Sequence, residues 1–182
     1  LMAIDKVRSD LELMYELFDR ELPGEWRKDG ISLYKGNVLL NENHQLVDWL
    51  ARLTGNTVTV FRDGTRIATS VMDGDQRAVG TQAANNVIEQ VLQGQTPYYG
   101  HADVVGQVYQ TAYRPLFDAQ GNAVGMLYTG ASPTIVDQTV SRFRIIVLFT
   151  SIIVGLLSAV SVYGFVSRGL LKPITTLCDK AD

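Results

Sequence analysis

Hydrophobic and polar positions along the chain predict first two helices and then a series of strands. Residues 3–22 place apolar side chains three or four apart, which is typical of an amphipathic helix, and Pro23 ends it. A second helix is expected over residues 43–53, with Asn41 or Asn43 as its cap and Gly55 just past its end. We expect the buried face of this helix to consist of Leu46, Trp49, Leu50 and Leu53.

Beyond the second helix the pattern alternates and becomes rich in β-branched residues, which predicts strands. Residues 56–62 and 65–71 are two such runs, and the Asp63-Gly64 pair between them is typical of a hairpin turn. A polar loop then leads to a short helix that we expect Thr81 to cap. Three further strands are expected at about 98–105, 107–117 and 123–130. Short connections imply antiparallel pairing, so the predicted fold is α+β, with a PAS-like five-stranded antiparallel sheet and a long N-terminal helix.

Residues 145–166 form a long run without any charged side chain. Their 22 residues, at about 1.5 Å each, reach roughly 33 Å as a helix, enough to cross the hydrocarbon core of a bilayer. Basic residues flank the run, with Arg142 and Arg144 before it and Arg168 and Lys172 after it. A buried core helix rarely needs so long an uncharged stretch, so we predict a single transmembrane helix that contacts membrane lipid.

The segment before this run links it directly to the predicted sheet. Ser132 and Pro133 are typical of a helix start, and nothing up to residue 166 breaks the helical pattern. A change in the last strand is therefore expected to reach the membrane helix without passing through a flexible linker. Small residues recur four apart within the apolar run, which permits close approach of a second helix and suits a homodimer: Ser151, Gly155 and Ala159.

Charge divides unevenly along the chain and narrows the class of partner. Residues 1–140 hold 11 Lys and Arg against 17 Asp and Glu, a net charge of −6, whereas residues 141–182 hold 5 against 2, a net charge of +3. An acidic domain joined to a basic membrane flank argues against nucleic acid as a partner. The one cysteine, Cys178, cannot form a disulfide within the chain.

An enzyme active site finds little support in the sequence. The two histidines, His44 and His101, have no Cys, Asp or Glu at the spacing of metal ligands. No Gly-rich phosphate loop precedes a helix, and no nucleophile elbow is present. We therefore predict no catalytic residue, no metal site and no cofactor.

A binding site for a small polar molecule is better supported, because the predicted strands carry aromatic and polar side chains together. Period-two parity places Tyr109, Thr111 and Tyr113 on one face of their strand, and Arg66 suits a carboxylate. Tyrosines are also ordinary sheet residues, and the sequence does not say which face is open. The candidate ligand-binding residues are Arg66, Thr69, Tyr99, His101, Tyr109, Thr111, Tyr113 and Tyr128.

Three runs along the chain together resemble a known family. They read TVTVFRDGTRIAT over 57–69, AVGT over 78–81 and YQTAYRPLFDAQGNAVGMLYTG over 109–130. These runs look like a single Cache domain, a PAS-like extracytoplasmic sensor of bacterial receptors. Past the apolar run, LLKPITTL over 170–177 is similar to the start of a HAMP linker. By position, the resemblance to citrate and dicarboxylate sensors implies Arg66, Thr69 and Thr111 as ligand contacts.

The resemblance implies a division of the chain into five parts. These are a stalk helix over 1–29, the sensor domain over 30–131, a connecting helix over 132–144, the transmembrane helix over 145–166 and the HAMP start over 167–182.

The family layout implies a receptor in the cell membrane, with residues 1–144 outside the cytoplasm and residues 167–182 inside it. The overall arrangement resembles a homodimeric methyl-accepting chemotaxis receptor that senses an organic acid, an amino acid or a similar small molecule. A further membrane helix is expected before Leu1. Two alternatives stay open: the sensor region of a histidine kinase or diguanylate cyclase, and a dimerisation or docking module that binds no small molecule.

Overall fold

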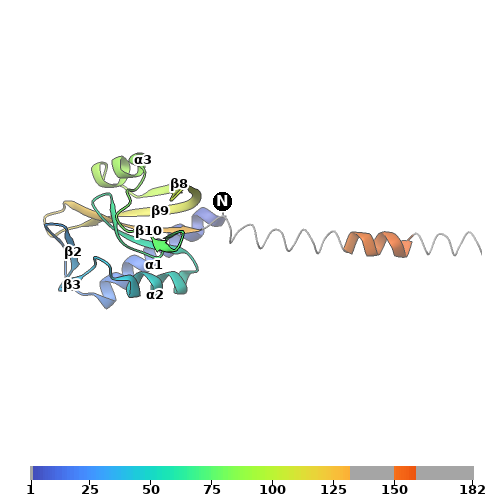
Figure 1. The fold of residues 1–182 in the computed structure, drawn as a ribbon, viewed down its shortest axis with the longest axis horizontal. Coiled ribbons are helices and arrows are strands. Elements are labelled where there is room, and N and C mark those ends of the chain that lie inside the picture. The colour runs from blue at the N-terminus through green and yellow to red at the C-terminus, as the bar shows by residue number, and fades with distance from the viewer. Residues whose placement is uncertain (1, 132–149, 159–182) are drawn as a thin grey trace, which may run out of the picture. The chain divides into compact units, whose positions relative to one another are not determined.

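The computed structural model describes residues 2–131 and 150–158 (Figure 1). The chain divides into two compact units, one up to Val136 and one from Asp137. All of the described strands lie in the first unit. The predicted connecting helix over 132–144 lies outside the described residues.

The two predicted helices are confirmed. The first is α1, Met2–Glu21, and the second is α2, His44–Thr54. The Asn43 side chain caps α2 by accepting a hydrogen bond from the Leu46 N–H, and Gly55 ends it in the left-handed conformation.

The predicted buried face of α2 is right for Leu50 and wrong for Trp49 and Leu53, which are 37 % and 54 % exposed. Val47, which was not predicted, is fully buried beside Leu50, and the predicted Leu46 is partly buried against the same core.

Five antiparallel strands form the main sheet, as predicted. In spatial order they are β5 (Thr65–Thr69), β4 (Thr57–Arg62), β10 (Ala123–Ala131), β9 (Gln107–Phe117) and β8 (Tyr98–Val104). The last strand in the chain therefore lies at the centre of the sheet, next to the first strand of the hairpin. The strand β5 is an edge strand, so its outer side is open to pairing with a loop.

Two small sheets complete the described strands. One contains β1 (Trp26–Asp29), β2 (Ser32–Lys35) and β3 (Val38–Leu39). The other is a hairpin of β6 (Met72–Asp73) and β7 (Gln76–Arg77) inside the segment that the sequence predicted as a polar loop.

The short helix after this hairpin begins later than predicted. It consists of α3, Asn85–Ile88, continued by a π-helical turn, η1, Glu89–Gln93. Ala84, not Thr81, occupies the cap position, and it makes no side-chain capping bond. The Thr81 hydroxyl is engaged elsewhere, because it donates to the Ala78 carbonyl and accepts from Arg66.

The sheet has a different cover on each side (Figure 1). On one side lie α1 and α2, and we call this side the helix face. On the other side lies α3 with η1, and we call this side the aromatic face. Buried aliphatic strand residues such as Val58, Val60 and Leu127 belong to the core of the helix face, whereas Phe61, Tyr113 and Tyr128 belong to that of the aromatic face.

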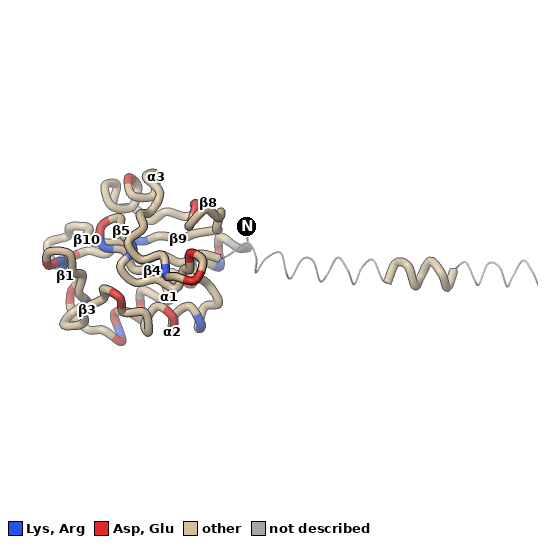
Figure 2. The backbone as a smooth tube through the Cα atoms, in the orientation of Figure 1, with Lys and Arg blue, Asp and Glu red and all other residues tan. Residues whose placement is uncertain are grey.

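Of the predicted transmembrane run, only residues 150–158 are described. They form a helix that carries no charged side chain (Figure 2), and their apolar side chains are exposed. Within the described residues, no helix has both the length and the apolar character needed to span a membrane. The rest of the predicted span lies outside those residues.

Candidate functional site

Cross-strand register sorts the eight predicted ligand-binding residues between the two faces. Residues that stand opposite each other in neighbouring strands share a face. Tyr128 stands opposite Thr59 and Tyr113, and Gly130 stands opposite Thr111. The register thus places six candidates on the aromatic face: Arg66, Thr69, Tyr109, Thr111, Tyr113 and Tyr128.

The other two candidates, Tyr99 and His101, lie on the helix face. The Tyr99 ring packs against the core of that face, and the guanidinium carbon of Arg8 in α1 lies 4.4 Å from its centroid. His101 stands opposite Gln110 and is exposed to solvent. No single pocket on one side of the sheet therefore brings all eight predicted residues together.

The aromatic face contains a charged side chain in its core. Arg66 of β5 is only 2 % exposed, and its guanidinium carbon lies 5.1 Å from the centroid of the Phe61 ring. One terminal nitrogen donates to the Thr81 hydroxyl at 2.5 Å, while Nε has no partner among the described residues. Burial lowers the pKa of Arg66, and the nearby Tyr113 and Tyr128 oppose that shift.

The buried arginine lacks the partner that buried charges normally have. Among residues 2–131 and 150–158, no carboxylate forms an ion pair with Arg66. An arginine stays protonated in proteins, and a buried cation without a counter-charge costs free energy. An anion that entered this site would supply the missing charge and accept from the unpartnered Nε.

Tyrosine and phenylalanine rings surround this position. The Tyr113 ring lies 4.9 Å from Tyr128 and 6.0 Å from both Phe61 and Tyr98, measured between centroids. Tyr128 exchanges a hydrogen bond with the Thr57 hydroxyl at 3.1 Å, but the Tyr113 hydroxyl has no partner among the described residues. Burial raises the pKa of both Tyr113 and Tyr128, so these hydroxyls stay neutral.

The two predicted threonines already have hydrogen-bond partners. Thr69 pairs with Thr59 through their hydroxyls at 2.6 Å, and Thr111 donates to the Gly100 carbonyl at 2.8 Å. Both threonines and Tyr113 are fully buried. The aromatic face is therefore closed to solvent at Arg66 in this conformation.

Two contributors to this region, Thr81 and Tyr98, were not among the predicted ligand-binding residues. Thr81 accepts the hydrogen bond from Arg66, and Tyr98 packs edge-on against Tyr113. The resemblance to the family at residues 78–81 could have pointed to Thr81, but the sequence pattern led us to expect Thr81 as a helix cap. Alternation within a strand does not show that Tyr98 stands opposite Tyr113, because the register between two strands is set only in the folded sheet.

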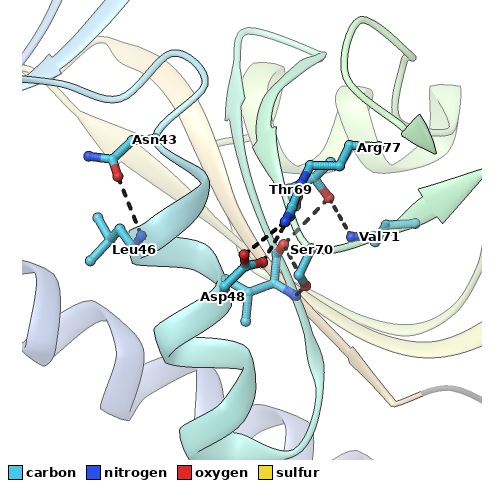
Figure 3. Close-up of polar contacts among 8 residues, drawn as sticks. Asn43, Leu46, Asp48, Thr69, Ser70, Val71 and Arg77 are labelled. Atoms are coloured by element: carbon cyan, nitrogen blue, oxygen red, sulfur yellow. Dashed lines mark hydrogen bonds and ion pairs between the residues drawn. The ribbon is translucent and has the colours of Figure 1, made fainter. Parts of the chain in front are cut away.

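A second polar cluster ties the covering loop to α2. Arg77 donates two parallel hydrogen bonds to the Asp48 carboxylate, both at 2.8 Å, and a third to the Thr69 carbonyl at 2.7 Å (Figure 3). The hydrogen bond from Arg77 is the main cause that lowers the pKa of Asp48, and the pKa of Arg77 is raised in turn. We call Asp48 and Arg77 the clamp.

Comparison with known proteins agrees with this fold. The sequence pattern of the family described as single Cache domain 3 matches residues 38–143. The solved sensor domain of DcuS from E. coli is similar in fold, with a TM-score of 0.50 and 13 % sequence identity. The alignment covers 78 % of this chain and 99 % of that domain. Among curated proteins, none matches the chain significantly.

Proposed function

This chain belongs to the single Cache domain 3 family, and from that membership we propose that it senses a small anionic molecule outside the cytoplasm and signals across the membrane. Cache domains are non-catalytic sensor modules, which agrees with the absence of catalytic motifs in the sequence. The fold shared with the DcuS sensor domain supports the sensor assignment at the level of architecture.

The observation that carries the proposal is the buried charge of Arg66, which has no ion-pair partner among the described residues and only a longer-range attraction to Asp103. Its Nε and the Tyr113 hydroxyl are buried polar groups without partners among the described residues. A carboxylate between them would satisfy both and neutralise the guanidinium. Arg66 and Tyr113 are the primary ligand contacts in this proposal, with Thr69, Thr111 and Tyr128 of the same face as further candidates.

The proposed layout keeps the five parts expected from the sequence. The sensor spans 30–131 after a stalk helix over 1–29, and a connecting helix over 132–144 leads into a transmembrane helix over 145–166. The segment 167–182 begins a HAMP linker in the cytoplasm. Ligand binding favours one packing of the aromatic face, and the central position of β10 suits it to pass that change to the following helix.

Among output types, we propose a homodimeric methyl-accepting chemotaxis receptor. The alternative is a membrane histidine kinase or diguanylate cyclase, which shares the same sensor and HAMP layout. The sequence that follows residue 182 distinguishes them, since long uninterrupted heptads mark a chemoreceptor and catalytic motifs mark an enzyme.

Ligand binding is tested by thermal unfolding of residues 1–182 in lipid nanodiscs. Trp26 is buried in the core of the helix face and Trp49 lies in α2, so tryptophan fluorescence reports the melting of the folded unit. Organic acids, amino acids and amines are screened in parallel. A ligand at a hundred times its dissociation constant adds about 2.7 kcal/mol and raises the melting temperature by about 5–15 °C.

The variant Arg66→Met decides where a hit binds. Loss of the shift in this variant supports the aromatic face, whereas an unchanged shift keeps the sensor function but places the ligand elsewhere. No stabilisation by any member of the panel would contradict small-molecule sensing and favour a docking or dimerisation module.

A further inference from the structure

The clamp joins α2 to the segment that leads into the loop over the aromatic face. Asp48 projects from α2, whereas Arg77 ends the β6–β7 hairpin that leads into the loop over the aromatic face (Figure 3). Both side chains are about 30 % exposed, so the pair is partly shielded from solvent. Two parallel bonds fix the guanidinium in orientation as well as in distance.

A short chain of hydrogen bonds connects the clamp to Arg66. Ala78 follows Arg77 directly, and its N–H donates to the Val71 carbonyl at 3.1 Å. The Ala78 carbonyl accepts from the Thr81 hydroxyl at 2.7 Å, and that same hydroxyl accepts from Arg66 at 2.5 Å. The orientation of the Thr81 hydroxyl, and through it that of the Arg66 guanidinium, thus depends on where Ala78 is held.

The backbone of the same loop pairs with the open edge of the sheet. The Arg66 N–H donates to the Thr81 carbonyl and the Gly80 N–H donates to the Arg66 carbonyl, both at 2.9 Å. The loop over 78–81 therefore extends β5 by an irregular extra strand. Arg77 directly precedes this loop, and its ion pair with Asp48 is the only one that joins residues 72–83 to another element among the described residues.

We propose that Asp48 and Arg77 are positioning residues for the ligand-binding arginine. The clamp holds the loop over 78–81 against β5, and Thr81 then orients and covers the Arg66 guanidinium. This inference rests on the proposed role of Arg66 as a ligand contact. An anion that accepts from Nε and from a terminal nitrogen of Arg66 together competes with Thr81 for the terminal N–H. Ligand binding then loosens the loop and, through the clamp, changes its hold on α2. The helix α2 is thereby a second recipient of the signal besides β10.

Hydrogen exchange without ligand tests the positioning role directly. Peptides that cover 64–69 and 78–83 are followed by mass spectrometry in residues 1–182 in nanodiscs. Asp48→Asn and Arg77→Gln are expected to speed exchange in both peptides by about five- to tenfold, because a partly exposed charge-assisted pair is lost. The double variant is expected to match Arg77→Gln, which also removes the hydrogen bond to the Thr69 carbonyl.

Arg52→Gln is the matched control. Arg52 lies one turn further along α2 and contributes only a longer-range attraction to Asp48. The variant Arg52→Gln removes a positive charge, as Arg77→Gln does, but exchange in the two peptides should stay within about twofold of wild type. Equal exchange in the wild type and the clamp variants would overturn the proposal.

A reagent that attacks guanidinium groups separates positioning from general loosening. Modification of Arg66 by phenylglyoxal is compared with that of Arg114 on the helix face in the same digest. The clamp variants and Thr81→Ala are expected to raise the rate at Arg66 by about tenfold and leave Arg114 unchanged, while Thr81→Ser restores slow modification. A rise at both arginines would mean that the clamp only stabilises the domain, which also overturns the proposal.

These readouts need no ligand, so they separate two kinds of failure. If no organic acid binds, the function proposed for Arg66 fails while exchange and modification still decide the role of the clamp. If an acid binds through Arg66 but the clamp variants leave both rates unchanged, the positioning role fails alone.

Discussion

The arginines on the two faces of the sheet have different environments. On the helix face, Arg114 pairs with Glu12 and stacks on Tyr15, with 3.8 Å between the guanidinium carbon and the ring centroid, and it keeps about 30 % of its side chain exposed. On the aromatic face, Arg66 is buried without an acidic partner among the described residues. One arrangement contributes to stability, and the other is the anion site that we propose.

Unpartnered polar atoms sharpen this contrast. The helix face also has some: the Thr129 hydroxyl and the Gln110 amide nitrogen are neutral, and Arg62, whose Nε is unpartnered, is partly exposed and pairs with Asp63. On the aromatic face the unpartnered Arg66 Nε belongs to a charged group, and the Tyr113 hydroxyl accompanies it. Because burying a charge costs far more than burying a hydroxyl, the aromatic face has more to gain from a ligand.

The largest expected effect is a loss of stability from the helix face. Leu11 of α1 is fully buried in its core, so Leu11→Ala should lower the free energy of unfolding by about 2–5 kcal/mol. Chemical denaturation followed by tryptophan fluorescence measures this loss. Leu13→Ala in the same helix is the control, since Leu13 is 43 % exposed and should cost less than about 0.5 kcal/mol. A small effect for Leu11→Ala would mean that α1 packs loosely.

The next effect is an increase in the free energy of unfolding, caused by a substitution on the aromatic face. Arg66→Met replaces a buried, unpaired cation with an apolar side chain of similar length, and should raise stability by about 1–3 kcal/mol. The same variant should abolish the thermal shift by an organic acid. Arg114→Met on the helix face loses an ion pair and should lower stability by up to about 1 kcal/mol. Destabilisation by Arg66→Met would indicate that its charge is already compensated.

Two tyrosines of the aromatic face provide a matched pair. Tyr113→Phe removes a buried hydroxyl that has no partner among the described residues and should stabilise the domain by about 1 kcal/mol. Tyr128→Phe removes the hydrogen bond to Thr57 and should destabilise it by about 0.5–1.5 kcal/mol. Equilibrium unfolding of both variants tests the difference, and effects of the same sign would contradict it.

The smallest effect concerns the pH dependence of the clamp. The pKa of Asp48 is lowered, mainly by the hydrogen bond from Arg77, with smaller contributions from Arg52 and His44. A lowered pKa in the folded state stabilises the protein above the unfolded pKa of about 4, and this is lost as pH falls through the folded value.

Unfolding of wild type and Asp48→Asn at several pH values measures the contribution of the clamp. The difference between them should be constant at about 1 kcal/mol from pH 5 to 7 and shrink below about pH 4. Asp63 pairs with Lys28 and is more exposed than Asp48, so Asp63→Asn should change stability by less than Asp48→Asn does. A difference that grows toward acidic pH would reverse the sign of the linkage.

Local chemistry in the sequence was enough for most of the elements. The period of α1, the Asn43 cap and the Asp63-Gly64 turn act within a few residues, so the sequence alone predicted them. Alternation also predicted which residues of one strand share a face, as for Tyr109, Thr111 and Tyr113.

Tertiary structure decided what depends on contacts between distant residues. Parity within a strand does not fix the relation between strands, so only the register of β8 with β9 placed Tyr99 and His101 away from Arg66. Threonine is a common helix-cap residue, but the Thr81 hydroxyl instead accepts a hydrogen bond from Arg66, fifteen residues earlier in the chain. The sequence by itself determined the kind of fold, and the packing of β5 against its loop decided which arginine is buried without a partner, because burial arises only when separate segments meet.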